Sequence, residues 1–235
     1  MADPNTPPSP ESFLSGSVGP ESRAVLEQQL AEHRAHLAVL PEGAGIVHRA
    51  HVLLDMGEAL IGLDRGAEAW EAVRPLLEPL VAADAWQEAV EACDVLYRAE
   101  QEESIRALGH GVWLSVTYPV KAQTTVAMLG HIVDETPEQA DGAAVAAMMA
   151  HYIAGLRTDG TERDSLMFLT TQIIARVARR HRGIEDQETL ETWIEMYELN
   201  NTDTLLQRLA RMLDAIVGGQ WWFDRDELRA RLPVN

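Results

Sequence analysis

The chain has 235 residues, of which 46% are apolar and 24% charged, and this composition is typical of a folded globular protein. Its 37 acidic and 19 basic side chains give a net charge of -18, which disfavours a DNA-binding protein and a protein that binds anionic membranes. The single cysteine, Cys93, excludes an internal disulfide and a multi-cysteine metal site, and it fits a reducing compartment.

Helical periodicity dominates the chain after a short N-terminal region. Residues 1–18 are rich in proline and serine and poor in large apolar groups, so we expect a flexible arm there. From Pro20 onward, apolar side chains recur at spacings of three and four residues, which indicates amphipathic helices. Pro75 lies inside the third of these segments and should kink it or start a new helix. The expected helices cover 20–40, 46–62, a segment from 67, 84–99, 101–116, 121–134, 138–157, 162–181, 187–199, 203–217 and 224–232.

One run, residues 114–120, has the composition of a strand. It is short, contains Pro119 and has no partner strand, so we interpret it as a connector. The sequence therefore predicts an all-α fold of about ten helices, in antiparallel hairpins that stack as an array or a compact bundle. Residues 19–219 are expected to form one domain, with a soft seam near 117–119, and residues 220–235 a C-terminal segment that contains aromatic residues.

Large and small side chains alternate in a fixed order within residues 50–100. The order is carried by Met56, Gly57, Leu60, Ala69, Val73 and Leu76. This region resembles the tetratricopeptide repeat, a helical hairpin whose stacked copies form a concave surface that holds a partner peptide. The resemblance implies stacked hairpins and a peptide-binding surface. The same small residues would suit any closely packed helical hairpin, and this alternative stays open.

Four histidines are arranged symmetrically about the first expected turn. His33 and His36 lie in the first helix and His48 and His51 in the second, so that 33 with 51 and 36 with 48 both centre on residue 42. Residues equidistant from the turn of a hairpin lie at the same level, which suggests a site for a divalent metal such as zinc. To bind one ion, the side chains must also point into the groove between the two helices. We therefore expect one histidine of each helix, His33 and His51, to form a pair, and the other two to lie at the rim of the groove.

Two further groups of polar side chains stand out in the sequence. His131 is followed one helical turn later by Asp134, which either orients the imidazole for proton transfer or is an ordinary surface pair. The basic cluster at 176–182 ends a predicted helix, where cations meet exposed carbonyl groups, so we interpret it as capping and local pairing. No nucleophile, oxyanion-stabilising pair or phosphate-binding loop accompanies these residues, so the sequence leans away from an enzyme and assigns no catalytic residue.

Three large aromatic residues, Trp221, Trp222 and Phe223, follow two glycines near the C-terminus. Such a cluster either folds back onto the helical core or anchors a partner, a role in which tryptophan is favoured. These three residues are therefore the candidate partner-binding residues.

These observations predict a non-enzymatic helical-repeat binding, adaptor or assembly protein that holds a polypeptide partner. Because the net charge is -18, the partner should be basic or carry a basic segment. DNA and membranes are not expected partners, no cofactor is expected, and homo-oligomerisation stays open. The lack of a signal peptide and the preference for Arg and Ala indicate a bacterial cytoplasmic protein. The alternative is a metal-dependent protein that uses His33, His36, His48 and His51.

Overall fold

The structure, a computed structural model, describes residues 20–41 and 43–232, and over these ranges it contains helices and no strands. The all-α prediction is confirmed, while the arm expected at 1–18 lies outside the described residues. None of the described helices is both long and apolar enough to cross a membrane. The elements are α1 (Pro20–Val39), α2 (Ile46–Gly62), α3 (Gly66–Val73), the 3-10 turn η2 (Arg74–Leu76), α4 (Leu77–Ala82), α5 (Trp86–Arg98), α6 (Ser104–Thr117), α7 (Ala122–Glu135), α8 (Gly142–Arg157), α9 (Gly160–Arg182), α10 (Gln187–Met196), α11 (Thr202–Val217) and α12 (Arg225–Ala230).

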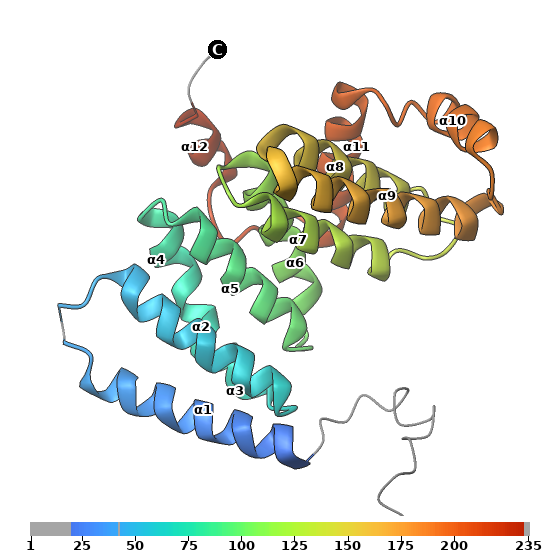
Figure 1. Cartoon of the computed structure of the whole chain (residues 1–235). Coiled ribbons are helices and arrows are strands. Elements are labelled where there is room, and N and C mark those ends of the chain that lie inside the picture. Colours follow the sequence, from blue (N-terminus) through green and yellow to red (C-terminus); the bar gives the residue numbers. More distant parts are fainter. Residues whose placement is uncertain (1–19, 42, 233–235) are drawn as a thin grey trace, which may run out of the picture.

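The helices from α1 to α9 follow one another in a row through the molecule (Figure 1). Contacts between α2 and α5, α5 and α7, and α7 and α9 place these four helices side by side, and we call them the α2–α9 layer. The intervening helices α3, α4, α6 and α8 connect them, so the chain forms antiparallel hairpins that stack in chain order. Helix α11 packs against α6 and α8.

Glycines allow the closest approaches between these helices. A Cβ atom on Gly57 of α2 would lie 2.7 Å from Val95 Cγ1 of α5 and 3.0 Å from Val73 Cγ2 of α3. A Cβ on Gly111 of α6 would lie 2.7 Å from Cys93 Cβ and closer still to Met128 Cε of α7. A larger side chain at either position would push neighbouring helices apart. Because they lack a side chain, the two glycines allow α2 and α6 to pack closely against α5.

The helical pattern is interrupted at Pro75 and after residue 117. Pro75 breaks the third segment as predicted, since α3 ends at Val73 and α4 begins at Leu77 after the 3-10 turn. The run at 114–120 is only partly a connector. Its first four residues complete α6, where Leu114 and Ser115 are buried, and its last three belong to the link between α6 and α7, residues 118–121.

Side chains from several helices contact this α6–α7 link. The Tyr118 ring stacks on Trp86 with ring centres 3.7 Å apart, and its hydroxyl donates to the carbonyl of Leu228 at 2.9 Å. Arg157 of α8 donates to the carbonyl of Val120 in the link at 3.1 Å, and to the carbonyls of Ser115 and Val116 at the end of α6 at 2.7 Å and 2.9 Å. The link therefore contacts α5, α8 and α12, at the position where the sequence suggested a seam.

Candidate functional site

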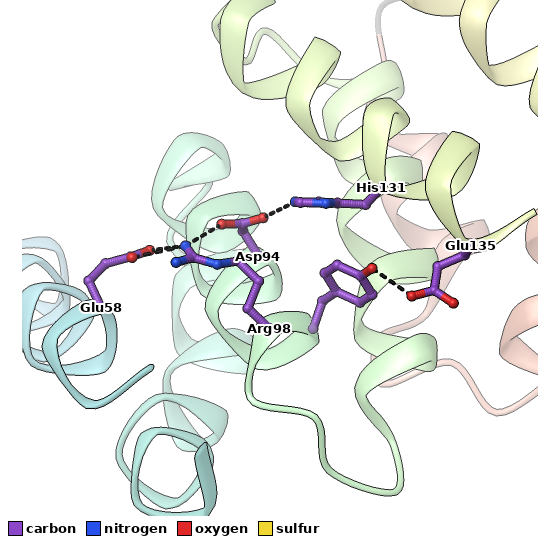
Figure 2. A network of polar contacts seen from close by, with 6 residues as sticks. Glu58, Asp94, Arg98, His131 and Glu135 are labelled. Atoms are coloured by element: carbon purple, nitrogen blue, oxygen red, sulfur yellow. Dashed lines mark hydrogen bonds and ion pairs between the residues drawn. The ribbon is translucent and has the colours of Figure 1, made fainter. Parts of the chain in front are cut away.

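A polar network crosses three helices of the α2–α9 layer (Figure 2). Nη1 of Arg98, on α5, lies 2.7 Å from Glu58 Oε1 of α2 and 3.2 Å from Asp94 Oδ2. The other oxygen of Asp94 accepts a hydrogen bond from Nε2 of His131, on α7, at 2.8 Å. Glu58, Arg98, Asp94 and His131 thus form a continuous chain of polar contacts from α2 to α7.

A second link between α5 and α7 lies beside this chain. The Tyr97 hydroxyl donates to Glu135 Oε1 at 2.7 Å, and the Tyr97 ring centre lies 4.6 Å from that of His131. Burial, together with the hydrogen bond and negative charge of Glu135, raises the pKa of Tyr97. The hydroxyl therefore stays protonated at neutral pH and acts as a donor.

The charge state of Asp94 follows from its neighbours. Burial alone would raise the pKa of Asp94, but the hydrogen bonds and charges of His131 and Arg98 outweigh that effect and lower it. Because the resulting carboxylate can only accept, the Nε2 atom of His131 carries the proton. The hydrogen bond holds the imidazole in one orientation. In the neutral ring, the other nitrogen, Nδ1, is then an acceptor.

The carboxylate that orients His131 is not the one suggested by the sequence. Asp134 pairs with Arg176 of α9 at 3.0 Å, while Asp94 of α5 takes the imidazole. Sequence reasoning chose the nearest acid on the same helix and missed Glu58, Asp94 and Arg98. A signal was present, because Asp94 and His131 are 37 residues apart, close to the period of one helical hairpin.

Open pockets flank the network on either side. One has a volume of about 700 Å³ and the other about 340 Å³. The first is lined by Ile61, Tyr97, Arg98, Glu100, Gln101, Glu102, Ser104, Ile105, His131 and Glu135, and the second by Leu54, Asp55, Glu58, Glu91, Asp94, Val95, Thr124, Ala127 and Met128. The network therefore lies between two depressions in one face of the molecule.

This part of the molecule is strongly acidic. Helices α2, α5 and α7 carry seven carboxylates and two guanidinium groups, and Arg98 is already paired with Glu58 and Asp94. The seven carboxylates are Asp55, Glu58, Glu88, Glu91, Asp94, Asp134 and Glu135. Clustered carboxylates give a negative potential that attracts cationic groups. We call the part of this surface around the two pockets the acidic face.

The four histidines of α1 and α2 do not gather into one site. The rings of His36 and His48 meet edge to face with centres 5.9 Å apart, so this is the pair, rather than His33 and His51. His33 Nδ1 lies 3.9 Å from Asp55 Oδ2, and His51 Nε2 lies 3.1 Å from Glu88 Oε1 of α5. His51 lies on the side of α2 that faces α5. Its distance from the turn predicts its height along the hairpin but not this direction. Within the described ranges, no three His, Cys, Asp or Glu side chains form a group suited to a metal ion.

The aromatic residues at 221–223 fold back onto α6. The backbone N–H of Trp222 donates to His110 Nε2 at 2.9 Å, and the two rings stack with centres 4.3 Å apart. Trp221 and Phe223 contact the same imidazole at 5.1 Å and 5.3 Å between ring centres. All three aromatic side chains are half-buried. The geometry is that of the fold-back alternative, and we call residues 219–232 the C-terminal latch.

His110 is held in a single protonation state by this latch. Its Nδ1 lies 2.6 Å from the carbonyl of Arg106, and its Nε2 faces the Trp222 N–H. A carbonyl can only accept and an N–H can only donate, so the proton is on Nδ1 and Nε2 is the acceptor. Burial, together with the positive charges of Arg74, Arg106 and Arg225, lowers the pKa of His110 to about 4. His110 is therefore neutral at pH 7.

The basic cluster at the end of α9 makes contacts within the molecule. Arg180 donates to the carbonyls of Val133 at 2.6 Å and Thr136 at 3.4 Å, and Arg182 donates to the Tyr197 hydroxyl at 2.7 Å. The cluster was expected to cap its own helix, but Arg180 instead caps the end of α7, and Arg182 joins α9 to the region after α10.

Comparison with known proteins gives no matching family model, no matching curated protein and no matching solved structure. The function is therefore inferred from the residues and geometry of this chain.

Proposed function

We propose that the chain is a non-enzymatic binding protein that holds a basic segment of a polypeptide partner on the acidic face formed by α2, α5 and α7. The observation that carries this proposal is the concentration of seven carboxylates on three adjacent helices, with five of these carboxylates lining the two open pockets. The resemblance of residues 50–100 to the tetratricopeptide repeat supports the same function, because that family holds peptides on stacked helical hairpins.

The distribution of these carboxylates favours an extended ligand. Asp55 and Glu58 are 62% and 49% exposed at their side chains, while Asp94 is 23% exposed and fixed by its two partners. Glu135 on α7 is exposed as well, so exposed carboxylates on α2 and on α7 can each meet a separate Lys or Arg of one segment. Arginine in particular would form two parallel hydrogen bonds with such a carboxylate.

The proposal can be tested with an unbiased peptide selection. The purified chain is immobilised and screened against a display library of random short peptides. We expect the enriched peptides to contain more Lys and Arg than Asp and Glu, and the affinity of the best peptide to fall as salt is raised. Enrichment of acidic or uncharged peptides would refute a basic partner.

Two variants with equal charge changes locate the binding surface. Asp55→Asn with Glu91→Gln removes two carboxylates that line one pocket, and Glu71→Gln with Glu195→Gln removes two exposed carboxylates on α3 and α10. We expect the first variant to weaken binding of the selected peptide by about tenfold and the second by less than about twofold, since each charge contact contributes roughly 0.5–1 kcal/mol. Equal losses in both variants would mean that net charge, and not the acidic face, governs binding.

A further inference from the structure

The acidic face continues into an apolar groove between α7 and α9. This groove has a volume of about 650 Å³, and its apolar walls are formed by Val126, Leu166, Leu169 and Ile173. Ala127 lines both the groove and the pocket that contains Asp55 and Glu91. The groove and that pocket are therefore adjoining parts of one surface.

The groove is open at a glycine. Gly130 of α7 lines the groove, and a Cβ atom at this position would meet no heavy atom within 4 Å. Gly111, by contrast, lies where neighbouring helices leave no room for a Cβ. The missing side chain at 130 thus serves no close helix crossing and leaves free space beside apolar walls. Leu169, on the opposite wall, is 48% exposed, so the groove presents apolar surface to solvent.

The charge of the molecule indicates what can cover this groove. The Asp134–Arg176 ion pair lies in its lining, and the adjoining pocket is acidic. A second copy of this chain carries the same net charge of -18, and its approach would bring like charges together. A segment that is basic at one end and apolar at the other satisfies both parts of the surface.

We propose that the groove takes one bulky aliphatic or aromatic side chain of the same partner segment that the acidic face binds. The inference rests on the proposed function and extends it to a two-part motif, a Lys/Arg pair followed or preceded by an apolar anchor. Neighbouring helices are about 8–10 Å apart and an extended chain advances about 3.3 Å per residue, so the anchor should lie roughly two to three residues from the basic pair.

The test uses a pair of synthetic peptides labelled with fluorescein. Each has a Lys-Arg pair in a Gly-Ser background, with either Leu or Ser placed about three positions away, and both chain orders are made. Fluorescence anisotropy measures their affinity for the full chain. We expect replacement of Leu by Ser to weaken binding to the wild type by about tenfold in the preferred order, the effect of burying one aliphatic side chain.

Variants of the groove should remove this difference. Gly130→Leu fills the open space, and Leu169→Asn removes an apolar wall without changing helix α7. In each variant the Leu and Ser peptides should bind within about twofold of one another, whereas Asp55→Asn with Glu91→Gln should weaken both peptides and keep their ratio. Circular dichroism at 222 nm checks that each variant is folded.

The outcomes separate the two proposals. Peptides that fail to bind the wild type, or that bind equally to wild type and the Asp55 and Glu91 variant, overturn both. Binding that depends on Asp55 and Glu91 but is the same for the Leu and Ser peptides overturns the anchor alone. An intact Leu preference in both Gly130→Leu and Leu169→Asn also overturns it.

Discussion

His110 anchors the C-terminal latch through a nitrogen that must stay unprotonated. A proton on Nε2 would face the Trp222 N–H, with Arg74, Arg106 and Arg225 close to the new charge. The pKa of His110 is about 4 in the folded chain, against an ordinary value of 6.5. Between these values the unfolded chain binds a proton that the folded chain does not. The stabilisation by neutral His110 is therefore complete above pH 6.5 and is lost as the pH falls toward 4.

Lowering the pH from 7 to 5 should therefore reduce the free energy of unfolding by about 2 kcal/mol through His110. Urea denaturation followed by tryptophan fluorescence measures this loss. Asp94 does not interfere, because its lowered pKa affects stability mainly below its ordinary value of 3.8. In His110→Gln the difference between the two pH values should shrink by about the same 2 kcal/mol. A pH dependence that is identical in both proteins would contradict the assignment.

Gly111 and Gly130 are both helical glycines, yet the same substitution should have opposite effects on them. A methyl group at 111 would collide with Cys93 and Met128, whereas at 130 it meets nothing within 4 Å. Gly111→Ala should lower the free energy of unfolding by about 1–3 kcal/mol, and Gly130→Ala should raise it by about 0.5–1 kcal/mol because alanine favours the helix. Urea titrations of the two variants measure both free energies of unfolding. Destabilisation by Gly130→Ala would show that no space exists for a side chain at this position.

Sequence reasoning identified some site residues and missed their partners. His131 was singled out, but Asp94, which orients it, lies on another helix 37 residues earlier. Which two helix faces meet depends on how neighbouring hairpins are rotated relative to each other. The spacing of residues within one helix does not determine this rotation. The same limit applies to His51. Its position along the hairpin follows from the sequence, but the direction of its side chain toward Glu88 does not.

At the scale of the helices, Arg157 of α8 supplies hydrogen bonds that the end of α6 lacks. Its guanidinium, at the end of α8, donates to the carbonyls of Ser115, Val116 and Val120 and to the Thr125 hydroxyl. Carbonyls at the end of a helix have no partner within it. Desolvation lowers the pKa of Arg157, so these acceptors compensate for the burial of its charge.

Arg157→Lys should lower the free energy of unfolding by about 1–3 kcal/mol, because an ammonium group cannot reach several carbonyls as the planar fork does. Amide exchange in residues 115–125 should accelerate more than exchange in α5. Uniform acceleration over the whole chain would instead indicate a general loss of stability. Arg163→Lys, on the exposed first turns of α9, provides the control substitution.

Helix positions were predicted within a few residues because apolar periodicity records which face is buried. The difference at α8, expected from 138 and observed from Gly142, has a local cause. The N–H of Ala140 bonds to the carbonyl of Pro137, which forms a separate turn before the helix begins. The C-terminal latch was the harder element, since its place against α6 depends on contacts over more than a hundred residues.

For the whole molecule, the net charge of -18 should control how fast a basic partner associates. Raising the salt concentration from about 50 mM to about 500 mM shortens the screening length from roughly 14 Å to roughly 4 Å. The association rate of the selected peptide should then fall by about tenfold or more, with a smaller change in its dissociation rate. Stopped-flow anisotropy measures both rates, and a constant association rate would exclude long-range attraction.

The C-terminal latch also bears on how the protein is completed during synthesis. Trp222 contacts a residue made 112 positions earlier, and Arg231 lies near Asp84, made 147 positions earlier. Helices α2 to α8 emerge from the ribosome first, with the His110 ring and Trp113 still uncovered. A nascent chain thus displays an aromatic surface on α6 until residues 219–232 have left the exit tunnel. A chain terminated before Gly219 would keep that surface exposed, where chaperones and proteases recognise unfinished proteins.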